Sequence, residues 1–192
     1  MHIGRHIVQE LVLQFRQPEV ERWDVQLTEP EFRRYQAQRD KGRAHDVAIW
    51  IQDGGTVALV SQTGYPDGAF AVPLGAIHPE ESFLDGAARA AREETGLLVR
   101  IEDYVLQIHA SLDFQESAVK WTTHVMLARH VDGTIGPLEG AEASSARWVT
   151  FPELTERVNP ILNSSGLGAL HYCARMHERL AELTAPDREF GT

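Results

Sequence analysis

The stretch Gly75–Leu97, GAIHPEESFLDGAARAAREETGL, decides the architecture of this chain. We expect a loop followed by a helix, because Ser82 is a favourable N-cap residue and Gly96 is a typical left-handed stop. The last turn of this helix carries Glu93 and Glu94. Acids at the negative end of a helix dipole are disfavoured by about 0.3–1 kcal/mol each. Their position therefore indicates a function for this segment rather than a gain in helix stability.

The spacing of particular residues in this stretch is more specific than its composition. Seven positions share a fixed pattern of glycine, charged and aliphatic residues: Gly75, Glu81, Arg89, Glu93, Glu94, Gly96 and Leu97. This pattern resembles the Nudix box, G-x5-E-x7-R-E-U-x-E-E-x-G-U, in which U is aliphatic. Ala91 is a weak match to U, and Ala90 stands where the box has the first glutamate of its R-E-U-x-E-E segment. The strand order from about Asp46 to Leu183 resembles the family more loosely.

The resemblance implies a fold, an activity and a set of site residues. The fold is α/β: the Nudix fold, in which a mixed β-sheet core packs between helices as an α/β/α sandwich. The activity is hydrolysis of a pyrophosphate bond in a nucleoside diphosphate derivative, with Mg²⁺ or Mn²⁺ as cofactor. We prefer a substrate of the nucleotide sugar or ADP-ribose type. The implied metal ligands are Gly75, Glu81, Glu93 and Glu94, and the implied catalytic residues are Arg89, Glu93, Glu94 and Glu142.

Electrostatics explains why a cation suits the end of this helix. Positions 90, 93 and 94 fall on one helix face, so Glu93 and Glu94 repel each other unless a cation lies between them. Mg²⁺ and Mn²⁺ prefer hard oxygen ligands such as carboxylates. For Arg89 we expect an ion pair that fixes one of the glutamates, as its counterpart in the family does.

Ala90 is the main departure from the family pattern. The glutamate that it replaces is commonly a metal ligand, and in some members it is the general base. Alanine does neither, and loss of a base costs about 10²–10⁴-fold in rate. Either another acid supplies the function, or the protein is a non-catalytic nucleotide-ligand sensor or interaction module; a structural member without a ligand is a third reading. The replacement candidates are Glu139, Glu142, His78 and Glu80.

The rest of the chain divides into three parts. Residues 1–44 form a polar, arginine-rich extension in which His6–Phe15 fits a helical stripe, with a strand as the alternative. A second helix is predicted near Thr28–Asp40, and pairing of two chains through the extension is left open. Residues 45–185 form the Nudix domain, and residues 186–192 form a tail. The domain contains predicted strands at 46–51, 56–62, 69–73, 99–110, 119–131 and 146–151, and a last helix from about Gly166 to Leu183.

Composition narrows the environment and the partners. The net charge of −10 argues against binding to nucleic acid or an anionic membrane surface. The N-terminus lacks the uninterrupted apolar run of a signal peptide, so we expect a cytoplasmic protein with a small-molecule substrate. The single cysteine, Cys173, rules out an internal disulfide and falls in a helical pattern, where we expect a small buried residue.

Overall fold

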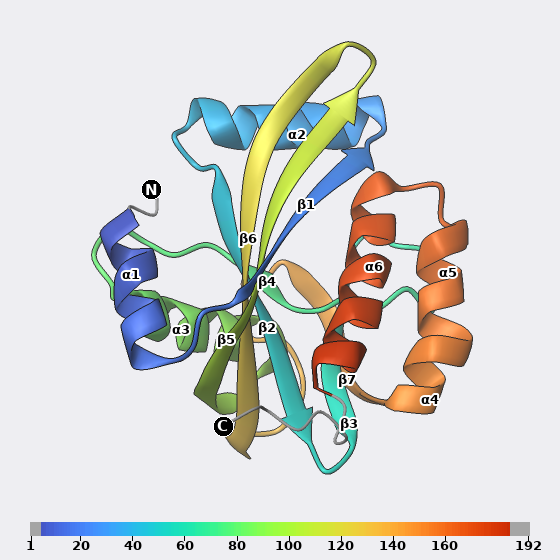
Figure 1. The fold of residues 1–192 in the computed structure, drawn as a ribbon. Coiled ribbons are helices and arrows are strands. Elements are labelled where there is room, and N and C mark those ends of the chain that lie inside the picture. The colour runs from blue at the N-terminus through green and yellow to red at the C-terminus, as the bar shows by residue number, and fades with distance from the viewer. Residues whose placement is uncertain (1–4, 185–192) are drawn as a thin grey trace.

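A computed structural model describes residues 5–184, so the predicted tail at 186–192 lies outside the described residues. The elements follow in the order α1 (Arg5–Gln14), β1 (Glu19–Gln26), α2 (Glu29–Asp40), β2 (His45–Asp53), β3 (Thr56–Gln62), β4 (Leu74–Gly75), α3 (Phe83–Thr95), β5 (Leu98–Phe114), β6 (Ser117–Asp132), β7 (Ala143–Thr150), α4 (Phe151–Glu153), the π-helical turn η1 (Leu154–Val158), α5 (Asn159–Ser164) and α6 (Gly168–Leu183). Figure 1 shows the strands at the centre of the molecule, with helices on both sides.

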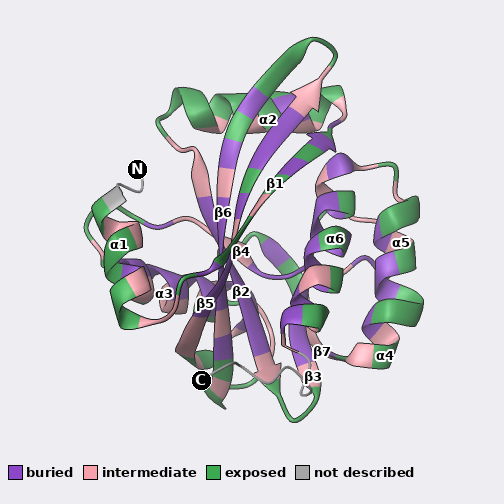
Figure 2. Cartoon of the chain, viewed as in Figure 1, coloured by how far each residue is buried: buried purple, intermediate pink, exposed green. Residues whose placement is uncertain are grey.

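Within the described residues, the strands form a seven-stranded mixed sheet in the order β1-β5-β6-β2-β3-β7, with β4 paired to β2. The pairs β1–β5 and β2–β6 are parallel, whereas β5–β6 and β3–β7 are antiparallel. Each sheet face has its own hydrophobic core, one beneath α2, α5 and α6 and one beneath α1 and α3. Figure 2 shows the buried residues running along the strands. The predicted α/β/α sandwich is therefore confirmed.

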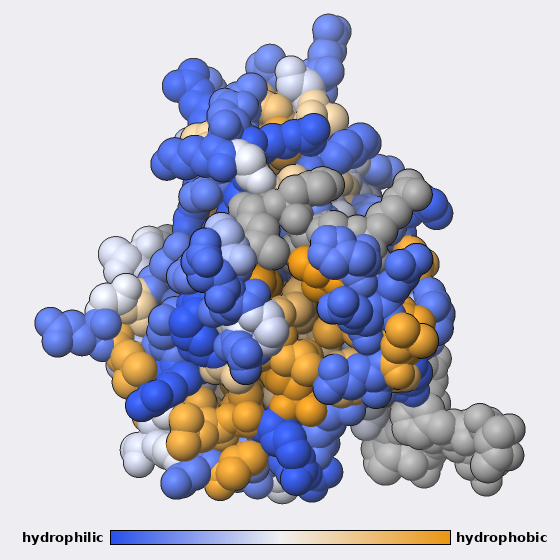
Figure 3. Space-filling view, turned by 90° about the vertical axis from the view of Figure 1, so that its left-hand side faces the viewer, coloured by the Kyte–Doolittle hydropathy of each residue, from blue (hydrophilic) through white to orange (hydrophobic). Residues whose placement is uncertain are grey.

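The first 44 residues are built into this sandwich. The two predicted helices are present as α1 and α2, and α2 begins with the expected capping box between Thr28 and Glu31. The strand β1 between them was not predicted, and it pairs in parallel with β5. Trp23 on β1 and Phe32 on α2 are both buried in the core beneath α6. In Figure 3 the upper end of the molecule, where Figure 1 draws α2, is mostly hydrophilic.

Two local predictions differ from the structure. The stretch 111–117, which separates the predicted strands 99–110 and 119–131, is mostly strand, because β5 and β6 form a long hairpin that turns at Gln115. Phe114 of this hairpin packs on Phe32 of α2, with 5.9 Å between ring centroids, so α2 supplies the apolar cover for its extended tip. Residues 69–73 contribute a single bridge, from Ala71 to Val60, rather than a strand. No helix among residues 5–184 is long and apolar enough to span a membrane.

Two buried histidines make the fold sensitive to acid. His177 on α6 accepts a hydrogen bond from the Val72 backbone N–H at 3.0 Å, and its other ring nitrogen lies 2.9 Å from Asn159 Oδ1. His124 on β6 is equally buried, with a ring nitrogen 2.7 Å from the Tyr104 hydroxyl. Burial lowers the pKa of each imidazole to about 3. Both rings are therefore neutral in the folded protein at pH 7.

We expect His177→Gln to weaken the acid sensitivity. Unfolding releases a histidine that binds a proton near pH 6.5, so stability is full above that pH and falls as the pH decreases towards 3. At pH 5, His177 lowers the free energy of unfolding by about 2 kcal/mol relative to pH 7. Urea unfolding at pH 7 and pH 5 measures it, with the exposed His171 of the same helix as the matched control, His171→Gln. Equal pH dependence in both variants would contradict the assignment.

Candidate active site

The loop before α3 folds back onto the helix through one arginine. Arg89 Nε and Nη2 donate to the two oxygens of Glu81 at 2.9 and 2.6 Å. The same guanidinium donates to Glu93 Oε2 at 2.7 Å and to the Ala76 carbonyl at 2.8 Å. An added Cβ on Gly86 would lie 2.6 Å from Glu81 Oε1, so the glycine inside the helix makes room for this carboxylate. The ion pair expected for Arg89 is present, with both Glu81 and Glu93.

Glu81 is already neutralised by these contacts. Hydrogen bonds from Arg89, aided by the His78 backbone N–H, lower the pKa of the Glu81 carboxyl to about 2 although its partial burial opposes the shift. Both Glu81 oxygens accept hydrogen bonds from the protein. Glu81 thus serves as an anchor that fixes the loop against α3.

The C-terminal end of α3 is held by the segment 133–143. Backbone N–H groups of Gly136 and Leu138 donate to the Thr95 and Glu93 carbonyls at 2.8 and 2.9 Å, which satisfies groups that a helix end leaves unpaired. The Glu94 carboxylate accepts the backbone N–H groups of Glu142 at 3.1 Å and Ala143 at 2.8 Å.

These contacts affect both the pKa of Glu94 and the position of Glu142. Burial raises the pKa of the Glu94 carboxyl, and the two backbone hydrogen bonds oppose this shift only in part. Because Glu94 bonds the backbone of Glu142, it also fixes the position of that residue relative to α3.

Ala90 lies against the backbone of β4. It is buried, and a Cβ added to Gly75 would come within 2.3 Å of the Ala90 Cβ. Gly75 and Ala90 therefore pack at a distance that no larger residue at position 75 would allow. The pairing of Gly75 with Val47 places this contact directly beside β2.

A cavity of about 540 Å³ opens beside the end of α3, within the usual range for small-molecule sites. Its wall includes residues of the box and of the segment 133–143: Gly75, Ala76, His78, Arg89, Ala90, Glu93, Glu94, Glu139 and Glu142. Residues of α2, β2, β6 and α6, and of the turn between α2 and β2, also line it: Tyr35, Gln38, Arg43, Asp46, Trp121, Leu170 and Cys173.

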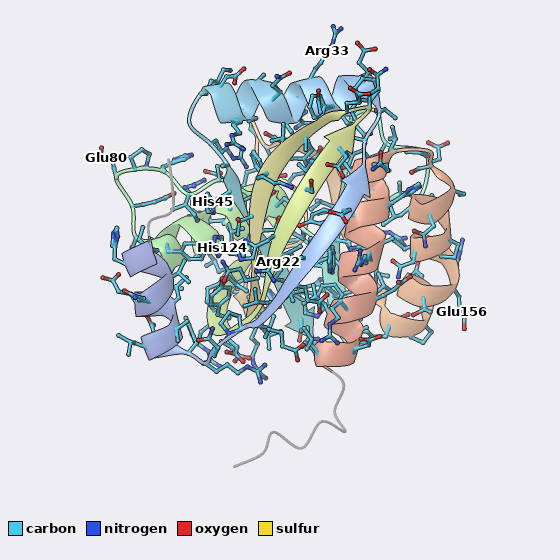
Figure 4. The ribbon with its side chains drawn as sticks, turned by 45° about the horizontal axis from the view of Figure 1, so that its top comes forward. Arg22, Arg33, His45, Glu80, His124 and Glu156 are labelled. Carbon is cyan, nitrogen blue, oxygen red and sulfur yellow. The ribbon has the colours of Figure 1, made fainter. Side chains whose placement is uncertain are left out.

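The candidate replacement acids have different surroundings. Glu142 Oε2 lies 3.1 Å from Arg34 Nη2 of α2, in an exposed ion pair at the cavity. Glu139 and His78 also line the cavity, whereas Glu80 does not and is exposed. Figure 4 shows Glu80 at the periphery of the molecule, away from His124 and the sheet. The structure therefore brings Glu139, Glu142 and His78 to the cavity and leaves Glu80 outside.

The fit of a divalent cation depends on two carboxylates. Among residues 5–184, no three histidine, cysteine, aspartate or glutamate side chains are arranged to hold a metal ion. Glu81 is bound by Arg89 and does not line the cavity. Glu93, which also accepts a hydrogen bond from Arg89, lies on the cavity wall with Glu94 and the backbone at Gly75. One or two carboxylates together with substrate phosphates are an ordinary environment for Mg²⁺. The donor set fits a cation that binds with its substrate, and it does not form a cage that is complete without one.

Several cavity residues were not predicted as site residues. Tyr35 and Gln38 lie on α2, in the part of the chain outside the resemblance, and Arg34 and Arg43 also line the cavity. Asp46 and Cys173 are buried residues of its wall. The expectation that Cys173 is a small buried helix residue is confirmed. For Asp46, the one available sequence signal was its charge in the otherwise apolar predicted strand 46–51.

Removal of Arg89 should destabilise the protein. In Arg89→Met, Glu81 keeps its partly buried carboxylate but loses its cation, so we expect a loss of about 2 kcal/mol in the free energy of unfolding. Arg89→Lys should lose part of this, because an ammonium does not reproduce the forked contacts to Glu81, Glu93 and the Ala76 carbonyl. Urea unfolding at pH 7 measures both variants. A loss below about 0.5 kcal/mol in Arg89→Met would place the network among ordinary surface ion pairs.

An α/β/α sandwich whose cavity ends at a Nudix box defines the class of the Nudix-type pyrophosphohydrolases. The NUDIX domain family matches residues 42–165, well over half of the chain. The chain belongs to the NUDIX family, whose hydrolases act on nucleoside diphosphate derivatives and generally use divalent metal ions. It matches none of the curated proteins.

Solved structures share the fold at low sequence identity. A NUDIX hydrolase from Nitrosomonas europaea is 17% identical with a TM-score of 0.53, over 73% of this chain and 91% of that one. The MutT protein from Methanosarcina mazei Go1 is 22% identical with a TM-score of 0.52, over 73% and 94%. The NUDIX domain of Shewanella oneidensis NrtR, complexed with ADP ribose, is 17% identical with a TM-score of 0.50, over 80% and 99%.

Proposed function

We propose that this protein hydrolyses the pyrophosphate bond of a nucleotide sugar or a compound of the ADP-ribose type, with Mg²⁺ or Mn²⁺. The observation that carries the proposal is the mixed lining of the cavity at the box. The carboxylates Glu93 and Glu94 and the aromatic side chains Tyr35 and Trp121 line the same cavity. A nucleoside diphosphate derivative combines a diphosphate, which binds with a cation, and an aromatic base. The ADP ribose held by the NrtR domain supports this substrate class.

In this proposal the cation is bound by Glu93, Glu94 and the backbone at Gly75. When bound, it neutralises the diphosphate and polarises a phosphoryl oxygen. Arg34, Arg43 and Arg89 line the same cavity, and guanidinium groups suit phosphate oxygens because they donate two parallel hydrogen bonds. The protein itself then binds and orients the diphosphate between the arginines and the two carboxylates.

We assign the general base to Glu142. It lies on the segment that Glu94 fixes against α3, and it lines the cavity beside the box. Its role is to take the proton of the attacking water. This requires the ion pair between Glu142 and Arg34 to open, or Arg34 to move from Glu142 to the substrate phosphate. Glu139 of the same segment is the other acid in reach of the cavity.

A second function is favoured by Ala90. Without the glutamate at that position, the site has fewer carboxylates for a cation than the family pattern provides. If Glu142 does not act as base, the protein binds a nucleotide ligand and hydrolyses it slowly or not at all. In that case the same cavity is the ligand-binding site of a nucleotide sensor.

A panel of compounds separates the two functions. The protein is incubated with ADP-ribose, several nucleotide sugars and diadenosine compounds in Mg²⁺ or Mn²⁺, and phosphate is measured after coupling to a phosphatase. Turnover that disappears in EDTA and falls at least about 10²-fold in Glu142→Gln supports the enzyme and its base. Absence of turnover together with a raised melting temperature in the presence of one compound supports the sensor. Turnover unchanged in Glu142→Gln would exclude Glu142 as the base.

A further inference from the structure

The strand β1 forms one edge of the sheet, because β5 is its one neighbour among the described strands. Its eight residues pair with β5 in an unbroken parallel register, from Glu19 with Leu106 to Gln26 with Asp113. Figures 1 and 4 show β1 at the front of the sheet, with α6 to one side of it. The side of β1 that faces away from β5 is therefore open to a further strand.

This free side presents the backbone groups of alternate residues. Leu27, directly after the strand, donates its backbone N–H to the Asp113 carbonyl of β5 at 2.8 Å. In a parallel ladder every second residue turns both its N–H and its C=O to the same neighbour, so the odd-numbered residues of β1 bond to β5. Val20, Arg22 and Asp24 turn theirs outward, and none of the three takes part in the backbone hydrogen bonds that residues 5–184 make outside their helices and strands. An edge of this kind is a template for pairing with another chain.

The side chains on the two faces of β1 have different surroundings. Glu19 and Glu21 lie on the face towards α6, and both form ion pairs with Arg179 of that helix. Arg22 and Asp24 alternate with them, so they project from the opposite face, where both are exposed. Within the described part of the chain, neither of these two residues belongs to an ion pair. The acids towards α6 are thus neutralised within the chain, whereas Arg22 and Asp24 are available to a partner.

These two charges select one way for two copies of the chain to pair. In an antiparallel pair centred on Trp23, Arg22 lies opposite Asp24 of the partner subunit, and Asp24 lies opposite the partner's Arg22. Opposite charges directly across two strands stabilise their pairing, and like charges destabilise it. A shift of two residues places Arg22 or Asp24 opposite its own copy. A shift of one residue sets each outward backbone group against a residue whose groups are bonded to β5.

We propose that two copies of this chain pair through β1, as antiparallel strands related by a two-fold axis at Trp23, so that the two sheets become one. The charges that oppose association with an arbitrary strand favour this register. A two-fold contact uses the same surface on both subunits, so the assembly closes at the dimer. The proposal is independent of the proposed function, because Arg22 and Asp24 do not line the cavity.

The association state of the full chain is the first test. One strand pair is a small contact, so we expect a dissociation constant on the order of 10 μM. Sedimentation equilibrium between about 1 and 300 μM covers the transition from monomer to dimer. The protein should reach twice the monomer mass and no more.

Charge reversal tests the register. Arg22→Asp sets acid against acid at both charge pairs, and Asp24→Arg sets base against base, so each should weaken the dimer by at least about tenfold. The double exchange Arg22→Asp/Asp24→Arg restores opposite charges with their sides reversed. It should return the dissociation constant to within about threefold of the wild-type value. The matched control is Arg157→Asp, the same change of charge at an exposed position of η1, which should leave the dimer unchanged.

Melting temperatures at about 1 μM, where the chain is monomeric, separate pairing from folding. We expect the two single variants and the double exchange to melt like the wild type, because both side chains are exposed. Three results would overturn the proposal: wild-type protein that is monomeric at about 300 μM, a single reversal that pairs as tightly as the wild type, or a double exchange that pairs no better than the single variants.

Discussion

Glu94→Gln should abolish most of the activity, with a loss of about 10²–10⁴-fold in kcat. Two effects act together. The substitution removes one of the two carboxylates available to a cation on the cavity wall. It also places an amide where both carboxylate oxygens now accept backbone N–H groups, from Glu142 at 3.1 Å and Ala143 at 2.8 Å. An amide NH₂ that faces a backbone N–H has no acceptor to offer, so the segment that carries Glu142 should shift.

Matched variants separate these two effects. Glu93→Gln removes a carboxylate whose contact is with Arg89 and not with that segment. We expect it to lose activity with a smaller change in melting temperature than Glu94→Gln shows. Glu156→Gln, on the exposed turn at the edge of the molecule in Figure 4, is the control and should change neither quantity. If Glu94→Gln lowers the melting temperature but keeps kcat, Glu94 is an anchor for the segment and its assignment as a metal ligand is wrong.

The box allowed the central part of the site to be predicted because its information is local. Ser82 and Gly96 cap α3 as expected, since capping depends on a few neighbouring residues. The ion pairs of Arg89 with Glu81 and Glu93 also follow from positions within about one helix length. Spacing along the chain fixes such contacts with little help from the rest of the fold.

The contributions of α2 and β2 to the cavity could not be predicted in the same way. The strand β1 carries alternating charged residues and pairs with a segment far away in the sequence, Glu19 with Leu106, so its pattern alone does not identify it. Tyr35 reaches the cavity because β1 and the β5–β6 hairpin position α2. The burial of Asp46 depends on which residues of β6 and α6 surround it, and burial of this kind is set by tertiary packing.

The close contact of Ala90 with Gly75 is a third feature that only packing determines. In the sequence, Ala90 is a missing glutamate. In the structure it is also the residue that contacts the backbone of β4, where an added Cβ on Gly75 would come within 2.3 Å of it. Ala90 also lines the cavity, as Glu93 and Glu94 do. The lost carboxylate is therefore a local change in an otherwise intact box.

Ala90→Glu should restore a third carboxylate to the helix face that already carries Glu93 and Glu94. Without metal, the added charge repels its neighbours and lowers the melting temperature, because like charges three and four residues apart destabilise a helix. With Mg²⁺ or Mn²⁺ the loss should be reversed. We expect cation affinity to rise by at least about tenfold, since each good carboxylate ligand contributes more than about 1.4 kcal/mol. If hydrolysis by the wild-type protein is slow for want of this group, kcat should rise by about 10²-fold or more.

The matched control is Ala88→Glu, which adds the same charge to α3 at a half-buried position that does not line the cavity. It should leave cation affinity and turnover unchanged. Mn²⁺ titration followed by electron paramagnetic resonance gives the affinity, and the phosphate assay gives kcat. If Ala90→Glu lowers an activity that the wild-type protein already has, the site has been rebuilt around the alanine. The base then lies elsewhere in the cavity, and Glu142, already fixed against α3 by Glu94, becomes the residue on which the reaction depends.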